Sequence, residues 1–69
     1  MSVMDIILSI NSLYDLYGKN GKKHAELIFN SVNTSLIRLV AKQVSLDPNG
    51  NRKEVINRII TYYFGENNT

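Results

Sequence analysis

Two cationic side chains, Arg52 and Lys53, follow a short segment that favours a tight turn. Pro48 and Gly50 lie in that segment, and a helical pattern of apolar residues begins after Asn51. A helix start exposes unpaired backbone N–H groups and the positive end of the helix dipole, so cations placed there make a site suited to phosphate. The sequence therefore predicts a phosphate-binding corner at Gly50, Asn51, Arg52 and Lys53.

A second cationic segment covers residues 19–24, where Lys19, Lys22 and Lys23 surround a glycine. Flexible lysines near a helix start act as point charges for phosphate, so this segment is a second candidate contact with a nucleic-acid backbone. A solvated loop explains it equally well, because its glycines do not have the spacing of a nucleotide-binding loop. His24 has no partner recognisable from the sequence.

Other cations lie on predicted helices. Arg38 and Lys42 are one turn apart on a predicted exposed helix face. They could extend the basic surface that binds phosphate, but an ordinary solvent-exposed helix face explains them equally well. Arg58 lies six residues after Arg52, well around the helix, so we expect a structural role for it, such as a pair with Glu54.

The charge is unevenly distributed along the chain. All eight basic residues fall between positions 19 and 58, where three acidic residues oppose them and leave a charge of +5. Three acidic residues give the flanks a charge of −3. Such asymmetry suits an anionic partner, although small soluble domains often have a basic surface.

The composition argues against most other kinds of site. With no cysteine and one histidine, the chain offers no disulfide, no credible metal site and too few groups for a catalytic centre, so we expect a non-enzymatic protein without a cofactor. The same composition favours an intracellular location. The apolar N-terminal residues lack the basic leader of a signal peptide, and no apolar run is long enough to cross a membrane.

The spacing of apolar residues at three and four positions predicts an all-α fold, a small bundle of about four short helices. Capping boxes at Ser2 and Asn51, each three residues before an acidic residue, mark two helix starts. The helices are expected from Ser2 to about Tyr17, Lys22 to about Val32, Leu36 to about Val44, and from after Asn51 until Gly65. They form one domain over residues 1–65, followed by a frayed tail, 66–69.

Helical periodicity also predicts the core. The first helix carries an apolar stripe of Ile6, Ile10, Leu13 and Tyr17, joined by Val3, Ile7 and Tyr14. The second turns Ala25, Ile28, Phe29 and Val32 inward. The last two helices are expected to share a core of Leu39, Val40, Val55, Ile56 and Ile59. Each of Tyr14, Tyr17, Tyr62 and Tyr63 lies at a helix end, where closing the core explains it better than stacking on bases.

Residues 36–63 resemble the SAP motif, a helix-extended loop-helix module of chromatin and DNA-repair proteins. The positions that match its second half are Gly50, Arg52, Glu54, Val55, Ile56, Arg58 and Ile59. Those that match the apolar face of its first helix are Leu36, Leu39, Val40, Ala41 and Val44. The chain departs from the motif in having Arg52 for the usual lysine, Ser45 for a frequent glycine, and Pro48 in the loop. The resemblance covers about half the chain and implies that the start of the second helix of the motif faces duplex DNA.

Two functions therefore remain open. The first is a small nucleic-acid-binding protein, with duplex DNA favoured by the resemblance alone. The second is a protein-interaction module that dimerises through its first helix or inhibits a larger partner. Exposure of most of Ile6, Ile10 and Tyr17 in the monomer would favour the second function.

Overall fold

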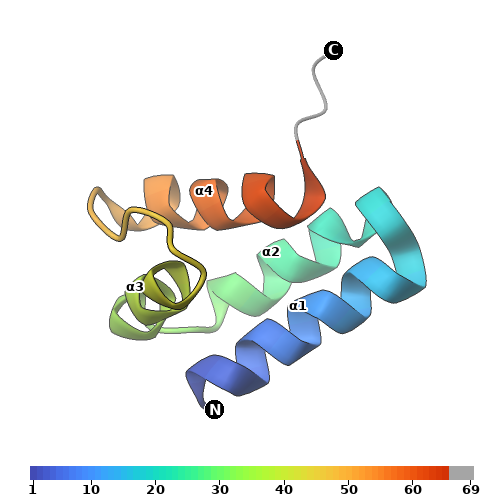
Figure 1. Ribbon diagram of the computed structural model, residues 1–69, viewed down its shortest axis with the longest axis horizontal. Helices are drawn as coiled ribbons and strands as arrows, with labels where there is room; N and C mark the ends of the chain where they lie inside the picture. The colour runs from blue at the N-terminus through green and yellow to red at the C-terminus, as the bar shows by residue number, and fades with distance from the viewer. Residues whose placement is uncertain (66–69) are drawn as a thin grey trace.

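The computed structural model describes residues 1–65, which fold into helices joined by short connections (Figure 1). The elements are α1 (Val3–Tyr17), the 3₁₀ turn η1 (Gly18–Gly21), α2 (Lys22–Asn30), α3 (Thr34–Gln43) and α4 (Arg52–Phe64). No strand occurs among the described residues, so the predicted all-α class is confirmed. The tail expected at 66–69 lies outside them.

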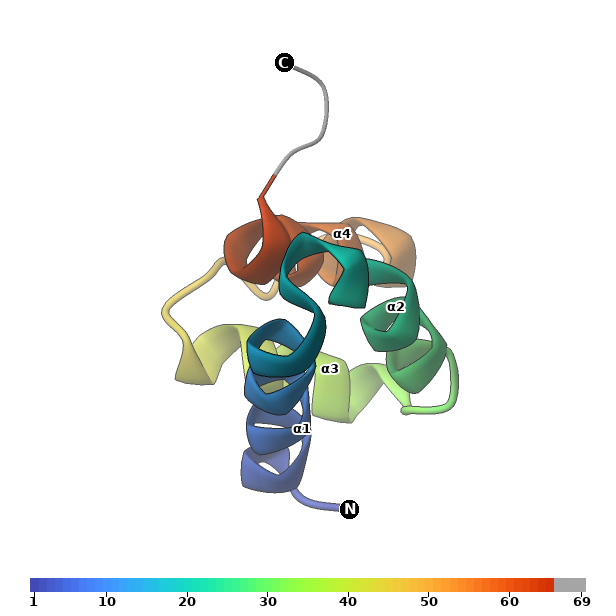
Figure 2. The same cartoon turned by 90° about the vertical axis from the view of Figure 1, so that its right-hand side faces the viewer.

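The helices pack around one core. In Figure 1, α1, α2 and α4 run roughly side by side, whereas α3 lies across one end of them and is seen along its axis. The quarter turn of Figure 2 shows α3 from the side, behind α1. α2 and α4 run in opposite directions, so the end of α2 lies near the start of α4. This arrangement decides which cations are neighbours.

Local capping signals place the starts of α1 and α4 as the sequence predicts. The Ser2 hydroxyl accepts a hydrogen bond from the Asp5 N–H (3.1 Å) and the Asp5 carboxylate accepts one from the Ser2 N–H (3.0 Å). These bonds from the Ser2 backbone and hydroxyl hold the pKa of Asp5 below its usual value. At α3 the Asn33 side chain accepts from the Leu36 N–H (2.9 Å), so that helix begins at Thr34, two residues earlier than expected.

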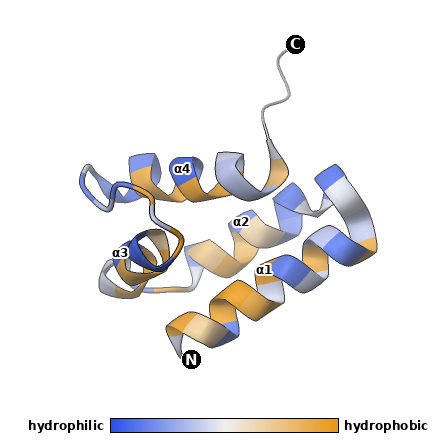
Figure 3. Cartoon of the chain, in the orientation of Figure 1, coloured by the Kyte–Doolittle hydropathy of each residue, from blue (hydrophilic) through white to orange (hydrophobic). Residues whose placement is uncertain are grey.

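The buried side chains come from α1, α2, α3 and α4, except for Val32, which follows α2. Within the described residues, none of the buried side chains is polar. The core comprises Ile6, Ile7, Ile10, Ala25, Phe29, Val32, Ile37, Val40, Ala41, Val55, Ile59, Ile60 and Phe64. Figure 3 shows the apolar side of α4 turned toward α2, with its polar side facing out. On α1, the buried residues Ile6, Ile7 and Ile10 belong to the predicted apolar stripe. On α2, Ala25 and Phe29 are buried, as the periodicity predicts.

Two positions of the core predicted for the last two helices are wrong. Leu39 is 49% exposed, because α3 turns Ile37 and Val40 inward and leaves Leu39 on its outer side. Ile56 is only half-buried, since the inner face of α4 is centred on Val55 and Ile59. Leu39 and Ile56 are two of the positions that carry the resemblance to the SAP motif.

The last turns of α1 reach past the core. Tyr17 is 47% exposed and Tyr14 is 44% exposed, so neither is fully buried in the stripe predicted for the first helix. Tyr14 contacts the edge of the core through Phe64, with ring centroids 5.9 Å apart. Tyr17 makes a different contact, with His24, which forms part of the candidate site below.

Gly21 sets the close approach of η1 to the rest of the fold. It is buried, and a Cβ there would lie 2.9 Å from the Leu13 carbonyl oxygen and 3.1 Å from a ring carbon of Phe64. Only a residue without a side chain fits between α1 and α4 at this distance. Gly21 therefore lets the backbone between Lys19 and Lys22 pack closely against α1 and α4.

Across residues 1–65, every helix falls short of the length and apolar character that crossing a membrane requires.

Candidate nucleic-acid interface

The Arg52 side chain is turned toward the protein. Its Nη2 donates to the carbonyl oxygens of Phe29 (2.7 Å) and Asn30 (3.4 Å), and its Nη1 donates to the Thr34 hydroxyl (3.1 Å). Carbonyls at the end of a helix lack partners within that helix, so a guanidinium is well suited to bind them. Arg52 therefore joins the start of α4 to the end of α2 and the start of α3.

The start of α4 also carries a carboxylate. The Asn51 side chain accepts from the Glu54 N–H (2.8 Å), and the Glu54 carboxylate accepts from the Asn51 N–H (2.8 Å). Glu54 thus places a negative charge where a bound phosphate would gain most from the helix dipole. Lys53 is exposed beside it. The geometry therefore makes this corner a weaker anion site than the sequence alone indicates.

Gly50 shapes the turn before α4. Its φ is +112°, and a Cβ at this position would lie 2.8 Å from Oε1 of Glu54. The positive φ and the close carboxylate both favour glycine, as the turn argument requires. Gly50 contributes to the candidate site by holding the capping box in place rather than by offering a group to a ligand.

The other two arginines hold the loop between α3 and α4. Arg38 donates through Nη1 to the carbonyl oxygen of Pro48. Arg58 donates through Nη1 to the carbonyl oxygens of Asp47 (2.7 Å) and Asn49 (2.8 Å). Arg58 therefore has the expected structural role, but it bonds to loop carbonyls instead of pairing with Glu54.

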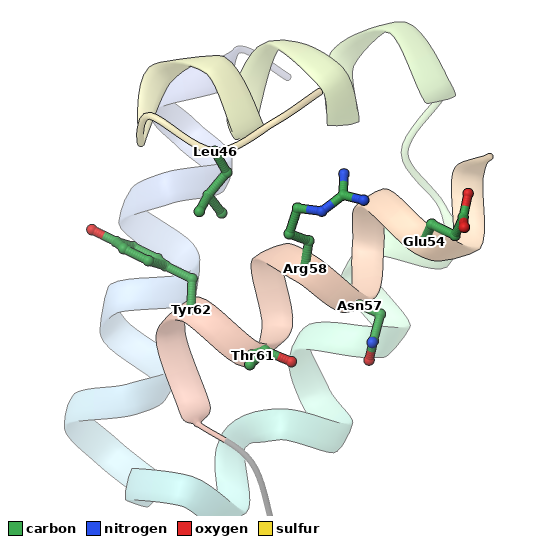
Figure 4. Close-up of a pocket in the computed structure, with 6 residues that line it drawn as sticks. All are labelled: Leu46, Glu54, Asn57, Arg58, Thr61 and Tyr62. Carbon is green, nitrogen blue, oxygen red and sulfur yellow. The ribbon is translucent and has the colours of Figure 1, made fainter. Parts of the chain in front are cut away.

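A shallow hollow of about 460 Å³ lies beside Arg58 between this loop and α4 (Figure 4). Its lining comprises Leu46, Glu54, Asn57, Arg58, Thr61 and Tyr62. Figure 4 shows the Arg58 guanidinium directed toward the loop that carries Leu46, while Asn57 and Thr61 extend from the other side of α4. Because the charged group of Arg58 already binds the loop, the hollow has little to attract an anion.

The lysines behave differently from the arginines. Lys19, Lys22 and Lys23, which we call the lysine corner, line an open hollow of about 430 Å³ together with Asn20 where η1 meets α2. Lys19 and Lys23 are exposed and Lys22 is half-buried. Within the described residues, no acidic side chain lines this hollow. Three cations here face solvent without a carboxylate among them.

An aromatic pair flanks the lysine corner. The rings of Tyr17 and His24 are stacked, with centroids 4.7 Å apart and planes inclined by 19°. Both side chains are exposed. Sequence reasoning missed this contact because the two residues belong to different helices, and their separation of seven positions spans the η1 turn.

The two predicted basic corners lie apart. The lysine corner is at the start of α2, whereas Arg52 bonds to its end. Nine helical residues at 1.5 Å each separate these places by about 13 Å. Glu26 contributes to the hollow beside Arg52 and Lys53, so an acidic residue lies between the two corners.

The remaining candidate cation, Lys42, is exposed on the last turn of α3.

Among residues 1–65, no three side chains drawn from histidine, aspartate and glutamate lie close enough together to hold a metal ion. Comparisons with protein-family models, curated proteins and solved structures found no match.

Proposed function

We propose that this chain is a small, non-enzymatic nucleic-acid-binding protein whose lysine corner contacts backbone phosphates. The observation that supports this most is the lysine corner itself, three cations around one hollow without an acidic neighbour in its lining. Lysine ammonium groups bind phosphate as point charges and tolerate many geometries, which suits contacts independent of base sequence.

The arrangement of the arginines supports the same choice of surface. Each of the three arginines donates to backbone carbonyls, so its guanidinium fork is engaged within the protein. Their charges still raise the local potential, but their hydrogen-bonding groups are less available to a ligand. The principal contact therefore moves from Arg52 and Lys53 to the lysine corner, with Lys53 as an outlying contact. Duplex DNA is the ligand that the SAP resemblance favours, and the expected location is intracellular.

The test is a titration of labelled nucleic acid at several salt concentrations. Three phosphate contacts predict that affinity falls about 100- to 500-fold over a tenfold increase in salt. Replacing Lys19, Lys22 and Lys23 together by Gln should remove most binding and most of its salt dependence. Lys42→Gln, on the exposed end of α3, removes one cation outside the lysine corner and should weaken binding only modestly.

Two results would contradict the proposal. One is a parent protein that binds neither duplex nor single strand at low salt. The other is a triple lysine variant that binds as tightly as the parent while its circular dichroism shows an intact fold.

A second function, a protein-interaction module, is favoured by the outer face of α1. Met4 and Leu8 lie one turn apart there and are 52% and 56% exposed, whereas Ile6 and Ile10 are fully buried. Ile6 and Ile10 of the predicted stripe are thus part of the monomer core, and an α1 contact between two copies would use Met4 and Leu8 instead. Sedimentation over a range of concentrations tests this function, since Leu8→Gln should shift a dimer toward monomer and a parent that is always monomeric excludes the dimer.

A further inference from the structure

The Tyr17–His24 stack borders the lysine corner along the chain. Tyr17 is the last residue of α1, immediately before η1, and His24 is the third residue of α2, immediately after Lys23. Figure 1 shows this α1–η1–α2 connection at one end of the molecule, away from the start of α4. Two stacked rings and three lysines therefore share one corner formed by eight consecutive residues.

The Tyr17 ring packs outside the core, although α1 supplies three of the core residues. Tyr17 remains 47% exposed, and its stacking partner is an exposed histidine rather than a core residue. The two nearly parallel rings cover each other on their facing sides, and both residues are exposed, so an outer ring face is open to a ligand only on the side away from the stack. Such a surface binds the face of a nucleic-acid base by stacking, and this contact tolerates every base because each has a π-face.

We infer that the Tyr17–His24 stack receives an unpaired base while the lysine corner holds the adjoining phosphates, so that the protein binds single-stranded nucleic acid more tightly than duplex. This inference rests on the proposed function and specifies its ligand. Within a duplex both faces of a base are covered by its neighbours, whereas a single strand can turn a base onto an exposed ring. A duplex therefore binds through the phosphate contacts alone, whereas a single strand binds through the phosphate contacts and through stacking of a base on the rings.

The experiment compares three labelled ligands of equal length: oligothymidylate, an abasic strand with the same phosphates, and a duplex. The parent should bind oligothymidylate most tightly. Tyr17→Leu should weaken oligothymidylate binding by about tenfold and leave abasic-strand binding unchanged, because stacking of one base is lost. Tyr17→Phe, which keeps the ring, should bind as the parent does.

Tyr62→Leu is the matched control. Tyr62 is 55% exposed and also contacts an aromatic ring, that of Tyr63 (5.0 Å). Its side chain lines the hollow beside Leu46 and Arg58 and is not part of the lining of the lysine corner. Its replacement should not change oligothymidylate binding. If Tyr62→Leu weakens binding as much as Tyr17→Leu, the base does not stack at this corner and the inference is wrong.

A fluorescent variant gives a second measurement that does not depend on removing the ring. The chain contains no tryptophan, so Tyr17→Trp introduces a single indole at the platform. Oligothymidylate should quench its emission, whereas the abasic strand should not. Absence of quenching at saturating oligothymidylate would overturn the inference.

The outcomes separate the inference from the proposed function. If the triple lysine variant loses binding to all three ligands while Tyr17→Leu binds oligothymidylate like the parent, the proposed function holds and the stacking inference is wrong. A parent that binds duplex as tightly as oligothymidylate also contradicts the inference alone. A parent that binds none of the ligands contradicts both.

Discussion

Replacing Arg52 tests whether this residue acts within the fold or on a ligand. Arg52→Met keeps an apolar stem and removes the guanidinium that donates to Phe29, Asn30 and Thr34. If the contacts are as described, the variant loses the connection between the start of α4 and the end of α2. We therefore expect a loss of stability rather than only a loss of nucleic-acid binding.

The magnitude follows from the three hydrogen bonds. A bond involving a charged group contributes about 1.5 to 3 kcal/mol, but Arg52 is partly exposed and its bond to Asn30 is long, at 3.4 Å. Solvent can also satisfy part of what is lost, so we expect a total near 2 kcal/mol. A domain of this length has about 3 to 10 kcal/mol of stability, and a loss of this size lowers its Tm by roughly 8 to 16 °C.

Thermal and urea unfolding, followed by circular dichroism, measure this loss. Lys53→Met is the matched control, because Lys53 is the next residue and is exposed, and it should change stability by less than about 0.5 kcal/mol. Arg52→Lys keeps the charge but not the planar fork, so it should recover less than half of the loss. If Arg52→Met unfolds like Lys53→Met, the assigned hydrogen bonds do not stabilise the fold. If Arg52→Lys is as stable as the parent, charge alone explains the effect and the argument from the fork is wrong.

Two further variants test the phase of α4 and the turn before it. Ile59→Ala, at a fully buried position, should cost about 2 to 5 kcal/mol, whereas Ile56→Ala at a half-buried position should cost less than half as much. Equal urea midpoints for these two variants would contradict the inner face described for α4. Gly50→Val should cost about 1 to 3 kcal/mol, because it strains a φ of +112° and forces Glu54 out of its capping bond, and an unchanged Tm would remove this reason for a glycine.

Local signals explain why parts of the fold could be predicted from the sequence. The capping boxes at Ser2 and Asn51 depend on residues three positions apart, and both are present in the structure. The inward positions of α1 and α2 follow from helical periodicity within each helix. The exposed position of Leu39 could not be predicted in this way, because periodicity alone does not say which side of α3 the other helices cover.

The candidate site was harder to predict because its contacts join distant residues. Arg52 bonds to residues that precede it by 18 to 23 positions, and no local pattern distinguishes such an arginine from one that faces a ligand. The Tyr17–His24 stack depends on the path of η1, which a glycine at position 21 allows. Charge counting located the basic segments but could not separate the cations that hold the fold from those that remain exposed.

The division between arginines and lysines has a physical reason in a domain with short helices. α2 has nine residues and the connection from α3 to α4 is irregular, so many carbonyl groups lack a partner within a helix. The three arginines reach five of these carbonyls, because one guanidinium can donate to several acceptors at once. Lysine has a single ammonium group with a strong preference for water, and three of the five lysines gather at the start of α2. The arginines that hold this small fold and the lysines proposed to contact an anionic ligand are therefore different side chains, so we expect that stability and binding can be altered independently.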